Sequence, residues 1–186
     1  MPHTALLIMD VQNGVVERFA DGSETLLDAL GRAITGARGA GLPVVYVRIG
    51  FRPGAPEISA ANRSFSALAG TGGFGVDDAA TQIHPAIAPR PHEAVVVKKR
   101  VSAFAGSDLD VVLRSLDVRS LVLTGIATSG VVLSTLRQAA DLDYGLTVLA
   151  DGCADRDPEV HRVLLEKVFP RQAVVIDTDG WLETVA

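Results

Sequence analysis

The stretch LVLTGIATSGVVLSTLR, residues 121–137, has the pattern of a strand followed by a tight turn and a helix. Residues 121–124 form a short apolar run, which is typical of a buried strand. Gly125 is expected to end that strand, and from Val131 onward the apolar residues have helical spacing. A turn of this kind aims backbone N–H groups at a crevice above a sheet, where an anion or a developing oxyanion is stabilised. The position where a nucleophile would be sought carries Val131.

Strands and helices alternate along most of the remaining chain. Further apolar runs predict strands at residues 4–9, 43–49, 93–97, 146–150 and 173–176, and helical patterns cover residues 24–40, 108–116, 131–141 and 158–169. Such alternation predicts a parallel sheet with helices on both faces, joined by right-handed crossovers. The sequence therefore indicates an α/β fold.

Residues 50–92 differ in composition from the rest of the chain. They hold most of the prolines and a cluster of glycines, with only patchy periodicity. We expect an irregular excursion with one or two short helices, inside a single domain that spans residues 1–186. A long excursion of this kind is typical of a lid or a binding loop.

The bulk composition excludes several classes of protein. The 186 residues are 48% hydrophobic and 21% charged, which suits one compact domain. The formal net charge is −5 and the basic residues are scattered, so we expect no nucleic-acid partner. No apolar run reaches the length of a membrane span or a signal-peptide core, so no membrane partner is expected. The single cysteine, Cys153, excludes an internal disulfide and fits a reducing, cytoplasmic location.

Three chemically informative features fall at the predicted carboxyl ends of strands. They are Asp10, Lys98 and the turn at residues 125–131. A strand-terminal Asp is commonly a turn former, and a Lys after a strand commonly reaches solvent. At one edge of a sheet, however, they form a candidate site. A nearby cation favours an ionised Asp10, which suits a general base, whereas a general acid would need a pKa raised by desolvation.

Four segments resemble one known family, the isochorismatase-like cysteine hydrolases. They are LLIMDVQNG at 6–14, VVVKKRVSAF at 95–104, GIATSGVVLSTLRQAADLDY at 125–144 and DGCADRDPEVH at 151–161. The resemblance implies a three-layer α/β/α sandwich around a mainly parallel six-stranded sheet. It also implies hydrolysis of a small-molecule substrate and assembly into a homodimer or a higher homo-oligomer. The four histidines show no metal-ligand spacing, and we expect neither a metal nor a cofactor.

The family's catalytic triad of Asp, Lys and Cys can be transferred by motif. It places the Asp at Asp10 and the Lys at Lys98, rather than at the neighbouring Lys99. The nucleophilic Cys falls on Val131, in the frame G-x-A-T-x-x-Cys. The resemblance also implies a cis peptide bond between residues 126 and 127.

Val131 and Ala127 depart from both subgroups of that family. Members that cleave amides, such as nicotinamidases and the carbamoylsarcosine and ureidoacrylate hydrolases, use the thiolate. Isochorismatases proper carry Gly at the Val131 position and Tyr at the Ala127 position, and they use the Asp as a proton donor. Two hypotheses follow: a hydrolase that works without a covalent thiol intermediate, or an inactive protein that binds a ligand in the same pocket.

Residues around the predicted cleft are candidates for substrate contact. Cys153 is expected to be a buried small hydrophobe rather than a nucleophile. The hydroxyls of Thr128 and Ser129 have no evident histidine base, so capping roles are expected for them. The candidates for substrate contact are Gln12, Ala127 and Gly130 from two of the matched segments, Phe19 from the residues that follow the first of them, and Asn62 and Phe65 from the excursion.

Overall fold

The computed structural model describes residues 3–19, 23–69 and 72–185 of the chain. Within these ranges, six parallel strands form one sheet in the order β3-β2-β1-β4-β5-β6. The predicted α/β fold with a parallel six-stranded sheet is confirmed. No helix in this described part is long and apolar enough to cross a bilayer.

The elements alternate as the apolar pattern predicts. The strands are β1 (Thr4–Met9), β2 (Val44–Ile49), β3 (Val95–Lys98), β4 (Ser120–Ile126), β5 (Gly145–Ala154) and β6 (Val174–Ile176). The helices are α1 (Asn13–Val16), α2 (Ser23–Gly39), α3 (Arg63–Ala69), α4 (Leu109–Ser115), α5 (Leu133–Asp141), α6 (Pro158–Val163) and α7 (Thr178–Val185).

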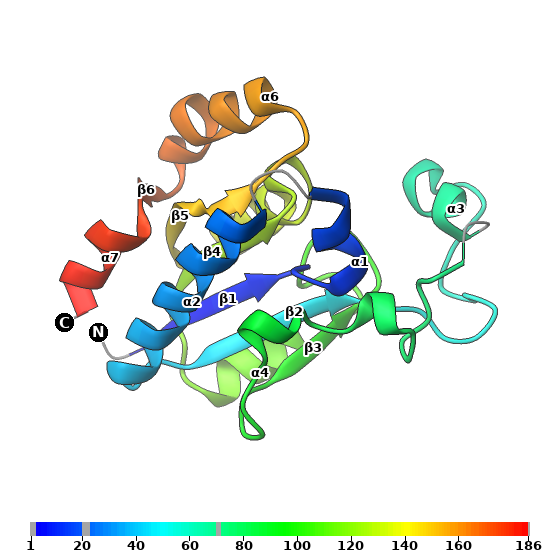
Figure 1. Cartoon of the computed structure of the whole chain (residues 1–186), viewed down its shortest axis with the longest axis horizontal. Coiled ribbons are helices and arrows are strands. Elements are labelled where there is room, and N and C mark those ends of the chain that lie inside the picture. Colours follow the sequence, from blue (N-terminus) through cyan, green and yellow to red (C-terminus); the bar gives the residue numbers. More distant parts are fainter. Residues whose placement is uncertain (1–2, 20–22, 70–71, 186) are drawn as a thin grey trace.

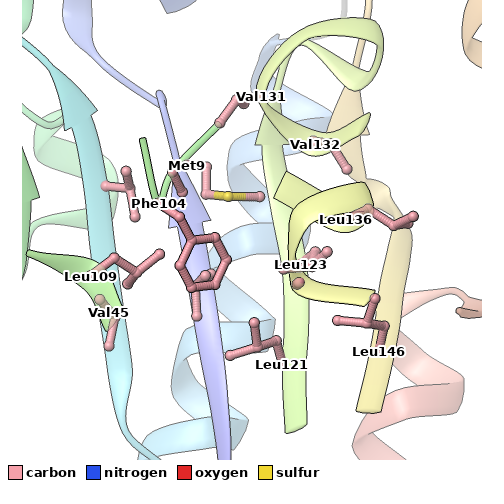
Figure 2. Packing of buried hydrophobic residues seen from close by; sticks show 14 of the residues in the cluster. Met9, Val45, Phe104, Leu109, Leu121, Leu123, Val131, Val132, Leu136 and Leu146 are labelled. Atoms are coloured by element: carbon pink, nitrogen blue, oxygen red, sulfur yellow. The ribbon is translucent and has the colours of Figure 1, made fainter. Parts of the chain in front are cut away.

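Helices cover both faces of the sheet, because side chains of a strand point alternately to its two sides. Leu6 and Ile8 of β1 pack in one cluster with the apolar stripe of α2 and with Trp181 of α7. Leu7 and Met9 point the other way and pack with residues of α4 and α5. Figure 1 shows α2 and α7 side by side on the sheet, and Figure 2 shows the second cluster around Met9. The molecule is thus a three-layer sandwich.

The excursion between β2 and β3 stands apart from the sheet in Figure 1 around α3, whereas Ile87 near its end packs in the cluster of α2 and β1. It contains α3 and two short 3₁₀ turns, Ala79–Thr81 and Pro85–Ile87. Phe51 and Phe65 pack edge to face, with ring centroids 5.8 Å apart, in a small cluster of their own. The expected irregular segment with a short helix is therefore observed.

Several predicted boundaries are wrong. Gly125 does not end β4, which continues to Ile126, and β5 runs four residues beyond the predicted end at residue 150. The helix predicted over 131–141 is divided into a π-type turn, Thr128–Val132, followed by α5. The helix predicted over 158–169 is also divided, into α6 and then a π-type turn, Leu164–Val168. Helices α1 and α7 were not predicted.

Candidate functional site

The order of the strands places a switch point between β1 and β4. From β1 the chain continues to β2 on one side of it, and β4 to β6 lie on the other side. In open α/β sheets, ligands bind outside the carboxyl ends of the strands at such a point. Asp10 directly follows β1, Ala127 directly follows β4, and Lys98 is the last residue of β3. All three therefore belong to the carboxyl edge of the sheet.

Asp10 and Lys98 form a buried ion pair at this edge. Lys98 Nζ lies 2.8 Å from Asp10 Oδ2, and only 2% and 12% of the Lys98 and Asp10 side chains, respectively, are exposed. Lys98 Nζ also donates to the carbonyl oxygen of Arg100 at 2.9 Å. The neighbouring Lys99 instead donates from its Nζ to the carbonyl oxygen of Gly50. The structure thus pairs Asp10 with the lysine that the motif indicated.

The second carboxylate oxygen of Asp10 has no partner in the described part of the protein. Asp10 Oδ1 is buried and has no hydrogen-bond partner among the described residues. The backbone holds the side chain in place, because Asp10 has a φ of +57° and its N–H donates to the carbonyl oxygen of Val47 at 2.8 Å. An unpartnered buried acceptor is costly, so such an atom is commonly kept for a ligand.

Burial and the ion pair act on the pKa of Asp10 in opposite directions. Burial raises the pKa of the Asp10 carboxyl above its usual range, and the charge of Lys98 opposes that rise without cancelling it. A carboxyl group with a raised pKa accepts a proton more readily than an exposed aspartate does, which suits it to proton transfer.

Gln12 braces the site with both ends of its amide. Its Nε2 donates to the carbonyl oxygens of Ile49 at 2.9 Å and Thr81 at 2.7 Å, and its Oε1 accepts from the N–H of Ile49 at 3.0 Å. Gln12 is 1% exposed. The side chain therefore ties the segment after β1 to the end of β2 and to the excursion, and its predicted contact with substrate remains a prediction.

The turn after β4 is fixed by its own backbone and by the segment after β5. The peptide bond between Ile126 and Ala127 is cis, as the resemblance implied. The N–H of Gly130 donates to the carbonyl oxygen of Ala127 at 3.0 Å, and the N–H of Ser129 donates to Asp155 Oδ2 at 2.7 Å. The Gly130 N–H is thus engaged within the turn, and anion binding by the backbone N–H groups around residues 130 and 131 remains a prediction.

His161 was missed as a partner of the turn. Thr128 Oγ1 and His161 Nδ1 lie 2.8 Å apart, so the expectation that Thr128 has no histidine nearby is wrong. Burial lowers the pKa of His161, and the charge of Asp155 opposes that effect. The sequence held a signal for this contact in the segment at residues 151–161. Asp155 and His161 follow β5, and β5 is the neighbour of β4 in the sheet. Thr128 itself is fully buried, which fits a bracing role.

The predicted nucleophile position is apolar and closed. Val131 is 2% exposed and belongs to the same cluster as Met9 and Phe104, at the upper end of the view in Figure 2. Cys153 is buried in this cluster as well, and its Sγ lies 4.0 Å from the carbonyl oxygen of Leu123. Burial raises the pKa of the Cys153 thiol to about 12, so the thiolate is scarce at neutral pH.

The remaining candidates for substrate contact are placed by the structure in different ways. Ala127 and Gly130 are partly exposed at the turn beside Asp10. Phe19 is partly buried, and the guanidinium of Arg156 lies 5.7 Å from the centre of its ring. Asn62 accepts the N–H of Phe65 at 3.1 Å and so begins α3, while Phe65 packs on Phe51. The last two side chains are thus engaged within the excursion.

No group of three or more His, Cys, Asp or Glu side chains in the described ranges is arranged to hold a metal ion. The fold and the ion pair together define a doubly wound α/β protein with a buried carboxylate–ammonium pair at the carboxyl edge of its sheet.

Comparisons with known proteins agree with this class. The isochorismatase domain model matches residues 4–180. A ureidoacrylate amidohydrolase from Stutzerimonas stutzeri is 32% identical, over 98% of this chain and 79% of the relative. The structure of an isochorismatase family protein from Burkholderia thailandensis matches with a TM-score of 0.88 and 26% identity, covering 100% of this chain and 96% of that one. The structure of N-carbamoylsarcosine amidase from Thermoplasma acidophilum matches with a TM-score of 0.78 and 28% identity. The match covers 95% of this chain and 96% of that one.

The chain belongs to the isochorismatase family of hydrolases.

Proposed function

We propose that this protein hydrolyses a small molecule without a covalent thiol intermediate, using Asp10 to move the proton and Lys98 to balance the charge. One observation carries the proposal. The Asp10–Lys98 pair is buried, with 2.8 Å between Oδ2 and Nζ, and the other oxygen of Asp10 has no partner among the described residues. A preorganised pair of this kind stabilises charge that develops in a water-poor site.

The proposed reaction uses Asp10 first as a base and then as an acid. Oδ1 takes a proton from a water molecule as the water oxygen forms a bond to the electrophilic carbon of the substrate. The proton then passes from Asp10 to the leaving atom as the scissile bond breaks, so one water molecule is added overall. The raised pKa of Asp10 favours this exchange, and Lys98 offsets the negative charge at both stages.

The absence of a thiolate step is supported by two residues. Val131 stands at the position of the family nucleophile and offers no reactive atom. Cys153 is 5% exposed, and burial raises its pKa to about 12. A thiol that is both closed from solvent and protonated is a poor nucleophile.

A second candidate function is ligand binding without turnover. The observation that favours it is the packing of Val131, a branched apolar side chain that is 2% exposed where amide-cleaving relatives are expected to carry a thiol. Under this alternative the Asp10–Lys98 pair would hold a polar group of a bound ligand and leave its bonds intact.

A turnover assay with a panel of substrates separates the two candidates. The panel contains ureidoacrylate, N-carbamoylsarcosine and isochorismate, and product formation is followed by mass spectrometry. Hydrolysis of any member supports the enzyme. A rise in melting temperature with one member and no product supports the binding protein, because a ligand that binds only the folded state stabilises it.

The variant Val131→Cys adds a direct check on the thiol. If this variant gains amide hydrolysis that the natural protein lacks, the other residues of the site are competent for that reaction. The missing thiolate is then what prevents amide cleavage in the natural protein.

A further inference from the structure

A hollow lies at the opposite end of the sheet from Asp10 and Lys98. Its volume is about 550 Å³, within the usual range for small-molecule sites. It is lined by the amino end of β2, the segment at residues 90–94 before β3, and the carboxyl-terminal parts of α2 and α4. Because β3 rises roughly 3.3 Å per residue, Ala94 in this lining and Lys98 at the catalytic edge are about 13 Å apart.

The walls of this hollow are largely apolar. Leu42, Val112 and Leu116 contribute to the lining, and Leu116 is 44% exposed. Covering an apolar surface that is partly open to water with the apolar body of a ligand lowers the free energy. The hollow therefore offers packing for an organic group.

A rigid ion pair forms one side of the hollow. Arg38 binds Glu93 through two hydrogen bonds, Nε to Oε1 at 2.8 Å and Nη2 to Oε2 at 2.7 Å. The N–H of Arg90 donates to the same carboxylate at 2.7 Å. Burial alone would raise the pKa of Glu93, yet the hydrogen bonds from Arg38 and Arg90 hold that pKa below its usual range. Glu93 is thus fully engaged and already neutralised.

The remaining charge in the hollow is positive. Glu93 is the one acidic residue among the described residues that line it, whereas two arginines, Arg38 and Arg90, line it. None of the ion pairs of the described residues includes the Arg90 guanidinium. In a chain with a net charge of −5, this is a local excess of positive charge beside an apolar wall.

We propose that this hollow is a second ligand site, which takes a small organic carboxylate with an apolar body. The Arg90 guanidinium binds the carboxylate, a pairing that suits the planar fork of arginine. Leu42, Val112 and Leu116 pack against the body of the ligand. The site is separate from the proposed hydrolytic site, which lies at the other end of β3.

Methyl-resolved NMR with benzoate as the probe tests this site by location. Saturable shifts at the methyl groups of Leu42, Val112 and Leu116, with those of Val131 and Met9 unmoved, are expected. Benzamide, which has the same shape without the charge, should bind at least fivefold more weakly. Shifts confined to Val131 and Met9, or no saturable shift at all, would overturn the proposal.

Two matched variants isolate the charge. Arg90→Gln should weaken benzoate binding at least fivefold, whereas Arg171→Gln, the same change at an exposed arginine elsewhere, should leave it unchanged. Equal affinity in Arg90→Gln and the natural protein would show that Arg90 does not bind the carboxylate, and the proposal would fall. Since neither arginine belongs to the hydrolytic site, these results are independent of the proposed reaction.

Discussion

At the scale of single residues, the pairing of Asp10 with Lys98 balances two large opposing effects. Removing both charges from water is unfavourable, and their attraction at 2.8 Å offsets that cost. The balance fails when one partner is removed, because the other remains buried as an uncompensated charge. Each residue therefore matters to stability as well as to the proposed reaction.

Lys98→Met should lower the free energy of unfolding at pH 7 by roughly 3–5 kcal/mol, the usual cost of breaking a buried pair. Urea denaturation measures this loss. The loss should shrink as the pH falls, because a protonated Asp10 needs no counter-charge. The double variant Asp10→Asn, Lys98→Met should regain much of the stability. A single variant as stable as the natural protein would contradict the burial of the pair.

The catalytic candidates could be read from the sequence, but their surroundings could not. Asp10 and Lys98 were predicted because both follow apolar strands that a parallel sheet brings to one edge. The link from Thr128 to His161 was missed, since a contact between residues 33 positions apart leaves no periodic pattern. The hydrogen bonds from the side-chain amide of Gln12 were missed for the same reason.

At the scale of elements, the approach of β1 and β4 depends on one glycine. Gly125 has a φ of +134°, and a Cβ built on it would lie 2.1 Å from the carbonyl oxygen of Met9. The strand continues through Gly125 because this residue has no side chain. A sequence pattern in which glycine ends a strand therefore placed the boundary too early.

Two substitutions of glycine by alanine should have opposite effects. Gly125→Ala should lower the free energy of unfolding by more than about 3 kcal/mol, because it forces a clash with backbone and a strained φ. Gly31→Ala in α2 has open space around it and should raise that free energy by about 0.5–1 kcal/mol through helix propensity. Urea unfolding of both variants is the measurement, and equal effects would refute the reading of Gly125.

The end of β5 was missed because polar residues interrupt its apolar run. Asp151 follows the predicted end, yet the strand continues to Ala154. Asp151 Oδ1 accepts hydrogen bonds from the N–H and the Oγ1 of Thr178, both at 2.8 Å. This contact reaches the start of α7, a helix that was also not predicted. A half-buried polar residue with distant partners cannot be distinguished from a loop residue by periodicity.

The excursion should open locally without unfolding the sheet. Phe65→Ala removes a main contact of the cluster around Phe51, so amides in residues 52–67 should exchange with solvent faster. Hydrogen exchange followed by mass spectrometry should show unchanged protection in β1 and β4. Val111→Ala, at a side chain that is 69% exposed on α4, should alter neither region. Faster exchange in β1 as well would mean that the excursion and sheet open together.

At the scale of the whole molecule, two buried acids make stability fall at alkaline pH. Burial raises the pKa of Cys153 from 9.0 and that of Tyr46 from 10.0, in each case to about 12. Above pH 9 the unfolded chain therefore loses protons that the folded chain retains. The unfolded state is thereby favoured, and stability falls as the pH rises from 9 towards 12.

Cys153→Ala should flatten this decline between pH 9 and 10, where the thiol accounts for up to about 1.4 kcal/mol per pH unit. Urea unfolding of both proteins from pH 8 to 10.5 gives the two slopes. Parallel curves would show that the Cys153 thiol is not closed from solvent in the folded state.

The general form of the molecule followed from the sequence because it rests on local patterns. Six apolar runs alternate with helical spacing, and the rules for parallel sheets then place Asp10 and Lys98 at one edge. The details of residues 50–92 could not be predicted, because the small cluster around Phe51 and Phe65 joins residues without a shared period.

The most direct measurement of the central claim is the turnover number of Asp10→Asn beside that of Cys153→Ala, on whichever panel substrate the natural protein hydrolyses. Circular dichroism first establishes that both variants are folded. Loss of the Asp10 carboxylate should reduce turnover by at least about 10²–10⁴-fold, the usual contribution of a general acid–base group. Cys153→Ala should retain the natural rate. A folded Cys153→Ala without activity, or an Asp10→Asn that turns over normally, would contradict proton transfer by Asp10 without a thiol.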